Sequence, residues 1–150
     1  MTLGEILAKD FIDKNVVIIG LPASGKTYLS NKISKNHLLI HTDDYKHYGF
    51  EQSMYIALDH VRNITGHSVC EGVQCYRMLR KSLEINYHWP DVIIECQRDT
   101  ANREQTYREE RNPNKLKYVR RFNDSLTSIY NQYLAEVDIK PEILVWNNNY

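Results

Sequence analysis

The sequence predicts a single α/β domain with a parallel β-sheet covered by helices on both faces. Strand-like and helix-like segments alternate along the 150 residues, which is typical of repeated β-α-β units. Most of the strand-like segments are apolar throughout, as in Val-Ile-Ile at 92–94, and such strands are buried on both faces of their sheet. The length suits one hydrophobic core, so residues 1–150 are expected to form one domain.

Local patterns predict each element in turn. Apolar residues spaced along residues 2–11 predict a short amphipathic helix. The apolar run at 15–20 predicts the first strand, and a glycine-containing loop separates it from a helix that ends near Ser34. Further strands are predicted at Leu38–His41, Ser68–Glu71, Trp89–Cys96 and Glu142–Trp146. Further helices are predicted at Phe50–Asn63, Cys75–Ile85, 99–112 and 115–137, the last two separated at Asn112-Pro113-Asn114 because proline disfavours helix at the residue before it.

The first loop carries the most specific pattern in the chain. Residues 20–27 read Gly-Leu-Pro-Ala-Ser-Gly-Lys-Thr and match the phosphate-binding pattern G-x-x-x-x-G-K-[ST] between a strand and a helix. We expect the backbone N–H groups to form an anion site at the helix N-terminus, with Lys26 reaching the β- and γ-phosphates and the Thr27 hydroxyl helping to hold Mg²⁺. The alternative is a glycine-rich turn with a solvated lysine. The residues expected to contact a nucleoside triphosphate are Gly20, Pro22, Ala23, Ser24, Gly25, Lys26, Thr27 and Tyr28.

Two adjacent carboxylates follow the second predicted strand. Phosphoryl transfer to a hydroxyl needs an acceptor for the hydroxyl proton and a group that places its oxygen in line. Asp43 and Asp44 lie where one carboxylate can do both, and we favour Asp43; the alternative is that either residue caps the next helix or turn. Tyr45 and Lys46 follow directly and are expected on the acceptor side. The nearby aromatic residues Tyr45, His47, Tyr48, Phe50 and Tyr55 either stack on a base-like acceptor or belong to the packing.

The third predicted strand ends in Glu71 and Gly72. Glu71 is expected to hold Mg²⁺ through water or to accept a hydrogen bond from the acceptor, and Gly72 to let the substrate approach the backbone. The alternative is an ordinary strand-end carboxylate beside a turn glycine.

Eight basic side chains lie within residues 98–121. Arg108 and Arg111 are three residues apart and share one face of a predicted helix. We expect a mobile arginine-bearing segment there to close over the triphosphate and to stabilise the charge of the transferring phosphoryl group. The alternative is a solvated helix with ion pairs such as Glu104 with Arg108.

Composition narrows the class of partner. The 19 basic and 19 acidic residues give a formal net charge of zero, so the chain as a whole is not attracted to nucleic acid, although a local basic patch remains compatible with it. Cys70, Cys75 and Cys96 lack metal-ligand spacing and indicate reduced thiols in a cytoplasmic protein, two of them on or beside buried strands. No apolar run approaches membrane-spanning length and the N-terminus does not resemble a signal peptide, so no membrane partner is expected.

Together these segments resemble the small P-loop kinases. GLPASGKT, HTDDYK, VCEG and REQTYREER occur in that family's order over nearly the whole chain. HTDDY is similar to the Asp-Asp-Tyr of phage-type polynucleotide 5′-kinases, which implies that Asp43 is the general base; the arginine that follows in that family is Lys46 here, and lysine cannot make the same bidentate fork to a phosphate. Glu71-Gly72 is similar instead to uridine-kinase and related small-molecule kinases.

The resemblance implies a three-layer P-loop NTPase fold with strand order 2-3-1-4-5, ATP with Mg²⁺ as the phosphoryl donor, and a short arginine-bearing lid. The expected function is an ATP-dependent kinase for a nucleoside, nucleotide or nucleic-acid hydroxyl, including a DNA 5′ end or a hydroxymethylated base. A kinase of a non-nucleotide metabolite is the alternative within the class. A nucleotide-hydrolysing switch and a silent ATP-binding scaffold are the alternatives outside it.

Overall fold

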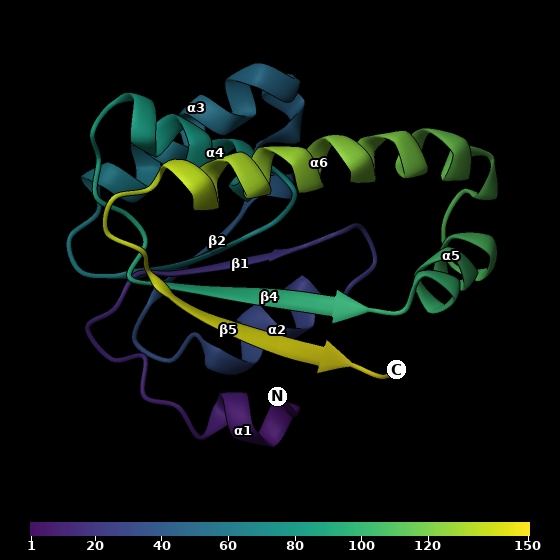
Figure 1. Cartoon of the computed structure of the whole chain (residues 1–150), viewed down its shortest axis with the longest axis horizontal. Helices are drawn as coiled ribbons and strands as arrows, with labels where there is room; N and C mark the ends of the chain where they lie inside the picture. The colour runs from purple at the N-terminus through teal and green to yellow at the C-terminus, as the bar shows by residue number, and fades with distance from the viewer.

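Five parallel strands form a central sheet with helices on both faces, which gives the molecule three layers (Figure 1). The computed structural model describes residues 1–150. The strand order is β2-β3-β1-β4-β5, so the predicted α/β class and the strand order that the resemblance implied are both confirmed. The strands are β1 (Val16–Gly20), β2 (Leu38–His41), β3 (Ser68–Glu71), β4 (Val92–Arg98) and β5 (Glu142–Asn148).

The helices divide between the two faces of the sheet. One face is covered by α1 (Leu3–Leu7) and α2 (Lys26–Ile33), and the other by α3 (Phe50–Asn63), α4 (Gln74–Glu84) and α6 (Leu116–Glu136). Beyond the carboxyl ends of the strands lie α5 (Thr100–Glu109) and the start of α6 (Figure 1). Two short 3₁₀ helices complete the chain, η1 (Thr42–Tyr48) and η2 (Pro113–Lys115).

The sheet separates two buried apolar clusters. Val17 and Ile19 of β1 belong to the larger cluster, beneath α3, α4 and α6. Val16 and Ile18 belong to the smaller one, beneath α1 and α2. Because both faces of β1 are buried, every residue of the strand is buried, and this explains why its sequence is apolar throughout.

The second and third strands and α3 have the predicted bounds, and the remaining elements differ at their ends. The first helix was expected over residues 2–11 but ends at Leu7, and the Asp10 carboxylate then accepts the N–H of Ile12 at 2.9 Å and forms a turn instead. Strands β4 and β5 each continue two residues beyond the predicted end, because their pairing extends to Arg98 opposite Asn148. The helix η1 was not predicted.

All three cysteines are buried, and none of them forms a disulfide bond. Cys70 lies on β3, Cys96 on β4 and Cys75 on α4, so the prediction of free thiols with two on strands is confirmed. Burial raises the pKa of the Cys96 thiol to about 12, and the group therefore stays protonated at neutral pH. These thiols act as small apolar side chains in the core.

Candidate active site

The loop between β1 and α2 has the backbone geometry of an anion-binding nest. Ala23 and Gly25 have positive φ angles of 66° and 100°. Left-handed residues within such a turn direct backbone N–H groups toward one concave side. Gly25 is also the N-cap of α2, so the positive end of the helix dipole adds to the attraction for a phosphate.

At both glycines of this loop, neighbouring atoms leave no room for a Cβ atom. A Cβ atom at Gly25 would lie 2.7 Å from Asn148 Nδ2, and one at Gly20 would collide with the Ser24 hydroxyl and lie 2.9 Å from the carbonyl oxygen of Cys96. The phosphate loop therefore packs directly on the carboxyl ends of β4 and β5, and its shape depends on residues far away in the sequence.

Two side chains from these strand ends hold carbonyl groups of the loop. Arg98 Nη1 donates to the Ala23 oxygen at 2.8 Å, and Asn148 Nδ2 donates to the Ser24 oxygen at 2.9 Å. In a planar trans peptide the C=O and the following N–H point in opposite directions. By fixing the Ser24 carbonyl, Asn148 therefore directs the Gly25 N–H away from itself.

We expect Asn148→Ala to weaken triphosphate binding about 5-fold, because it removes one hydrogen bond of about 1 kcal/mol that orients the loop. Titration with a fluorescent triphosphate analogue measures this effect. Asn147→Ala is the matched control, since Asn147 is exposed and makes no side-chain hydrogen bond. Equal affinities for the two variants would show that Asn148 does not orient the loop.

Lys26 begins α2 and points back into the loop. Its ammonium donates to the carbonyl oxygens of Gly20 at 2.8 Å and Leu21 at 3.2 Å, and the residue is 8% exposed. Burial lowers the pKa of Lys26, and the negative charge of Glu71 partly opposes that shift. A cation held in such a dry position is a strong site for the oxygens of a triphosphate.

Glu71, the last residue of β3, contacts the last residue of β2 and the first turn of α2. The residue is 4% exposed, and its Oε1 accepts a hydrogen bond from the Thr27 hydroxyl at 3.1 Å. The same oxygen lies 2.6 Å from Nδ1 of His41, the last residue of β2. Thr27 and Glu71, the two residues predicted to serve Mg²⁺, therefore lie in contact, and their oxygen atoms are the ligand type that this ion prefers.

Asp43 lines the same cleft as the phosphate loop, and the three residues that follow it do not. The cleft lining includes Asp43 in the first turn of η1 but not Asp44, Tyr45 or Lys46. The Tyr45 hydroxyl lies 2.6 Å from His60 Nδ1 of α3. Among the four residues predicted at this position, the structure brings only Asp43 to the cleft.

Gly72 lines the same cleft, but the neighbouring Thr42 side chain explains why a glycine is needed at this position. Its φ is 129°, and a Cβ atom there would collide with the Thr42 hydroxyl. The close approach observed is thus between β3 and η1 of the protein itself. The prediction that Gly72 admits substrate to the backbone stays a prediction.

The aromatic residues after Asp43 do not form one stacking pocket. Tyr45 contacts His60, and the rings of His47 and Tyr48 contact each other. Tyr55 lies beneath Lys81. Their separate partners favour the packing alternative.

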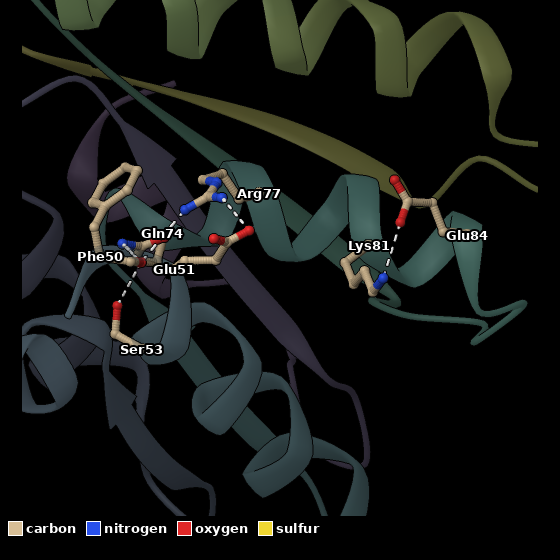
Figure 2. A network of polar contacts seen from close by, with 7 residues as sticks. All are labelled: Phe50, Glu51, Ser53, Gln74, Arg77, Lys81 and Glu84. Atoms are coloured by element: carbon tan, nitrogen blue, oxygen red, sulfur yellow. Dashed lines mark hydrogen bonds and ion pairs between the residues drawn. The ribbon is translucent and has the colours of Figure 1, made fainter. Parts of the chain in front are cut away.

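Phe50 instead lies outside the cleft lining and packs against Phe122, which lines the cleft. Its carbonyl oxygen accepts from Gln74 Nε2 at 2.9 Å and Arg77 Nη1 at 3.4 Å, as Figure 2 shows. The Arg77 guanidinium lies 4.6 Å from the centre of the Phe50 ring, and Phe122 of α6 contacts that ring from another side. These contacts fix the start of α3 to α4 and α6.

The two predicted arginines are placed differently. Arg111 lines the cleft, with its guanidinium 5.2 Å from the ring centre of Tyr107, which lines it too. Arg108 lies outside the lining and pairs with Glu104 at 3.5 Å, which is the ion pair considered as the alternative for this segment. Glu104 also accepts two hydrogen bonds from Arg120, at 2.7 and 3.0 Å, and this joins α5 to α6.

The phosphate loop and the surrounding helices enclose a cleft of about 340 Å³. Its lining comprises loop residues, Glu71 and Gly72 at the end of β3, Asp43 of η1, Arg111, and side chains from α5 and α6. The loop residues in the lining are those predicted to contact the triphosphate, except Gly20, which lines a second cavity instead. The remaining lining residues are Val73, Tyr107, Val119 and Phe122.

Sequence reasoning missed His41, Arg98 and Asn148. Each is the last residue of its strand, and this is the only local signal that marks them, because strand ends gather at the ligand edge of a parallel sheet. Their partners lie 30, 75 and 124 residues away in the chain.

Comparison with protein-family models and with curated proteins gives no match to this chain. No helix in the structure is long and apolar enough to cross a membrane.

Proposed function

We propose that this protein is a P-loop kinase that transfers the γ-phosphoryl group of ATP to a hydroxyl group. The observation that carries the proposal is that one cleft is lined both by the loop with the phosphate-binding sequence pattern and by a carboxylate, Asp43. Phosphoryl transfer requires a nest for the donor phosphates and a proton acceptor for the attacking hydroxyl in one enclosed space.

The donor half of the site uses α2 and β3. Lys26 binds the β- and γ-phosphates, and the N–H groups of the loop surround them. The oxygens of Thr27 and Glu71 hold Mg²⁺, Glu71 through water. The bound ion supplies charge neutralisation for the phosphate oxygens.

The acceptor half uses η1. Asp43 accepts the proton of the attacking hydroxyl as its oxygen bonds to the γ-phosphorus, and it orients that oxygen in line with the leaving group. The hydroxyl belongs to a nucleoside, a nucleotide or a nucleic acid, including a DNA 5′ end or a hydroxymethylated base. A non-nucleotide metabolite is the alternative acceptor.

The roof of the site is a lid made of α5, η2 and the first turns of α6. Arg111 is its cationic group over the phosphates and stabilises the charge of the transferring group.

Arg111→Ala is expected to lower kcat about 10- to 100-fold, measured in steady-state transfer assays. Arg108→Ala is the matched control, with an expected change below about 2-fold because Arg108 is engaged with Glu104. Equal losses for both variants would assign the effect to the stability of α5 instead.

Radiolabel transfer from γ-labelled ATP with Mg²⁺ tests the proposal. The acceptor panel comprises 5′-hydroxyl DNA and RNA, hydroxymethylpyrimidine DNA, nucleosides, nucleoside monophosphates and simple sugars, with γ-labelled GTP as a parallel donor. Label on one acceptor, lost in Asp43→Asn, is the expected result. Label released only as free phosphate across the panel would contradict a kinase and favour a nucleotide-hydrolysing switch.

A further inference from the structure

His41 and Glu71 face each other because they are register partners at the ends of neighbouring strands. Strands β2 and β3 pair in parallel, with His41 opposite Glu71. In a parallel pair such partners place their side chains on the same face of the sheet. Nδ1 of His41 lies 2.6 Å from Oε1 of Glu71, and the Glu71 side chain is 5% exposed.

The direction of this hydrogen bond follows from chemistry. An ionised carboxylate only accepts hydrogen bonds, so Nδ1 of His41 carries the proton and donates it. The Thr27 hydroxyl donates to the same oxygen at 3.1 Å. The other oxygen, Oε2, takes no hydrogen bond from the protein, although Glu71 lines the cleft.

Because both donors bind Oε1, the two oxygens of the carboxylate have different environments. Oε1 is held back toward β2 and α2, and Oε2 is left for a water molecule or a ligand in the cleft. The Thr27 proton is directed to Oε1, so the lone pairs of its hydroxyl oxygen remain free for a cation. Lys26 makes no hydrogen bond to Glu71, because its ammonium donates to the carbonyl oxygens of Gly20 and Leu21.

We propose that His41 is a positioning residue for Mg²⁺-nucleotide binding, acting through Glu71. This inference rests on the proposed function and adds a residue to its metal site. Without His41, Thr27 is the only donor to a buried carboxylate, and Glu71 can turn away from the Thr27 hydroxyl. Partners that orient a metal-serving carboxylate in this way change metal affinity about 10- to 100-fold.

Binding of a fluorescent ATP analogue, measured with Mg²⁺ and with EDTA, tests this role without requiring turnover. His41→Leu is expected to raise the Kd about 10-fold in Mg²⁺ and less than about 2-fold in EDTA. His41→Asn is the rescue variant, because its side-chain amide also donates from an atom bonded to Cγ, and its Kd in Mg²⁺ is expected within about 3-fold of wild type. A magnesium titration at fixed nucleotide should show the same order.

His47→Leu is the control, since His47 is exposed on η1, its ring packs on Tyr48, and its side chain makes no hydrogen bond to Glu71. Equal weakening of His41→Leu in Mg²⁺ and in EDTA would overturn the inference, because it would indicate general damage to the site. An unchanged Kd, or no recovery in His41→Asn, would overturn it as well. Thermal melting of each variant separates these outcomes from loss of folding.

The same binding assay distinguishes failure of the proposed kinase function from failure of the proposed role of His41. Wild-type protein that binds Mg²⁺-nucleotide but transfers no phosphoryl group would contradict the proposed kinase, and the effect of His41 on binding would still be measured. Wild-type protein that binds no triphosphate would contradict both.

Discussion

Lys26→Met is expected to weaken triphosphate binding about 100-fold or more and to abolish measurable transfer. The ammonium is buried within the phosphate loop, 2.8 Å from the Gly20 carbonyl oxygen. There its charge-assisted hydrogen bonds to phosphate, each of about 1.5–3 kcal/mol, are not weakened by water. Methionine has a similar length and no charge, so the change isolates the charge from the shape of the side chain. Nucleotide titration followed by a transfer assay measures both losses.

The same substitution is expected to stabilise the nucleotide-free protein. Because burial lowers the pKa of Lys26, the folded state binds this proton less tightly than the unfolded chain does. The resulting penalty is present in full below the lowered pKa and disappears as the pH rises toward the ordinary lysine value of 10.5. We expect the variant to melt about 2–4 °C higher at neutral pH, for a gain of about 1 kcal/mol, and the difference to shrink in alkaline buffer.

A lower melting temperature for Lys26→Met at neutral pH would contradict this account. It would show that the hydrogen bonds from Lys26 to the Gly20 and Leu21 carbonyl oxygens outweigh the cost of burying the ammonium. Lys32→Met is the matched control, because Lys32 is an exposed residue on the same helix.

Asp43→Asn is expected to lower kcat about 100-fold or more while the Kd for ATP changes less than about 2-fold. The amide fills the same space and can still hold a hydroxyl in place, but it does not accept its proton. Asp43 lines the same cleft as the phosphate loop and makes no hydrogen bond or ion pair with Lys26, Thr27 or Glu71. Single-turnover transfer with saturating ATP measures the chemical step directly.

Asp44→Asn is the matched control for that experiment. Asp44 is the adjacent residue of η1, is also exposed and lies outside the cleft lining. Normal turnover in Asp43→Asn, with a loss in Asp44→Asn, would move the general-base role to Asp44. Normal turnover in both would remove it from this pair.

Much of the fold was predictable because it depends on local patterns. Strands β2 and β3 and helix α3 have the expected bounds, since apolar runs and helical spacing are properties of short windows of sequence. The loop between β1 and α2 was predictable for the same reason, as its pattern occupies eight consecutive positions, 20–27; that it binds phosphate stays a prediction. The position of Asp43 followed from one further rule, that strand ends in a parallel sheet gather at one edge.

The choice among candidate residues depended on tertiary structure. Arg108 and Arg111 share a predicted helix face, but α5 ends at Glu109, and only Arg111, beyond that end, lies in the cleft. Asp43 and Asp44 are neighbours in sequence, and the turn of η1 places only Asp43 in the lining of the cleft. The helix η1 has no strong local signal, since short 3₁₀ turns arise where a chain must connect two packed elements.

By itself, the sequence determined which segments form the sheet, and it predicted where a triphosphate would bind and which residue types would serve it. The tertiary structure decided which side chains complete that site: His41 beside Glu71, and Asn148 beside the phosphate loop. Both contacts depend on strand order and register, which place residues 30 and 124 positions apart in the chain next to each other. Such pairings arise from the packing of whole strands and helices, and no window of sequence contains both partners.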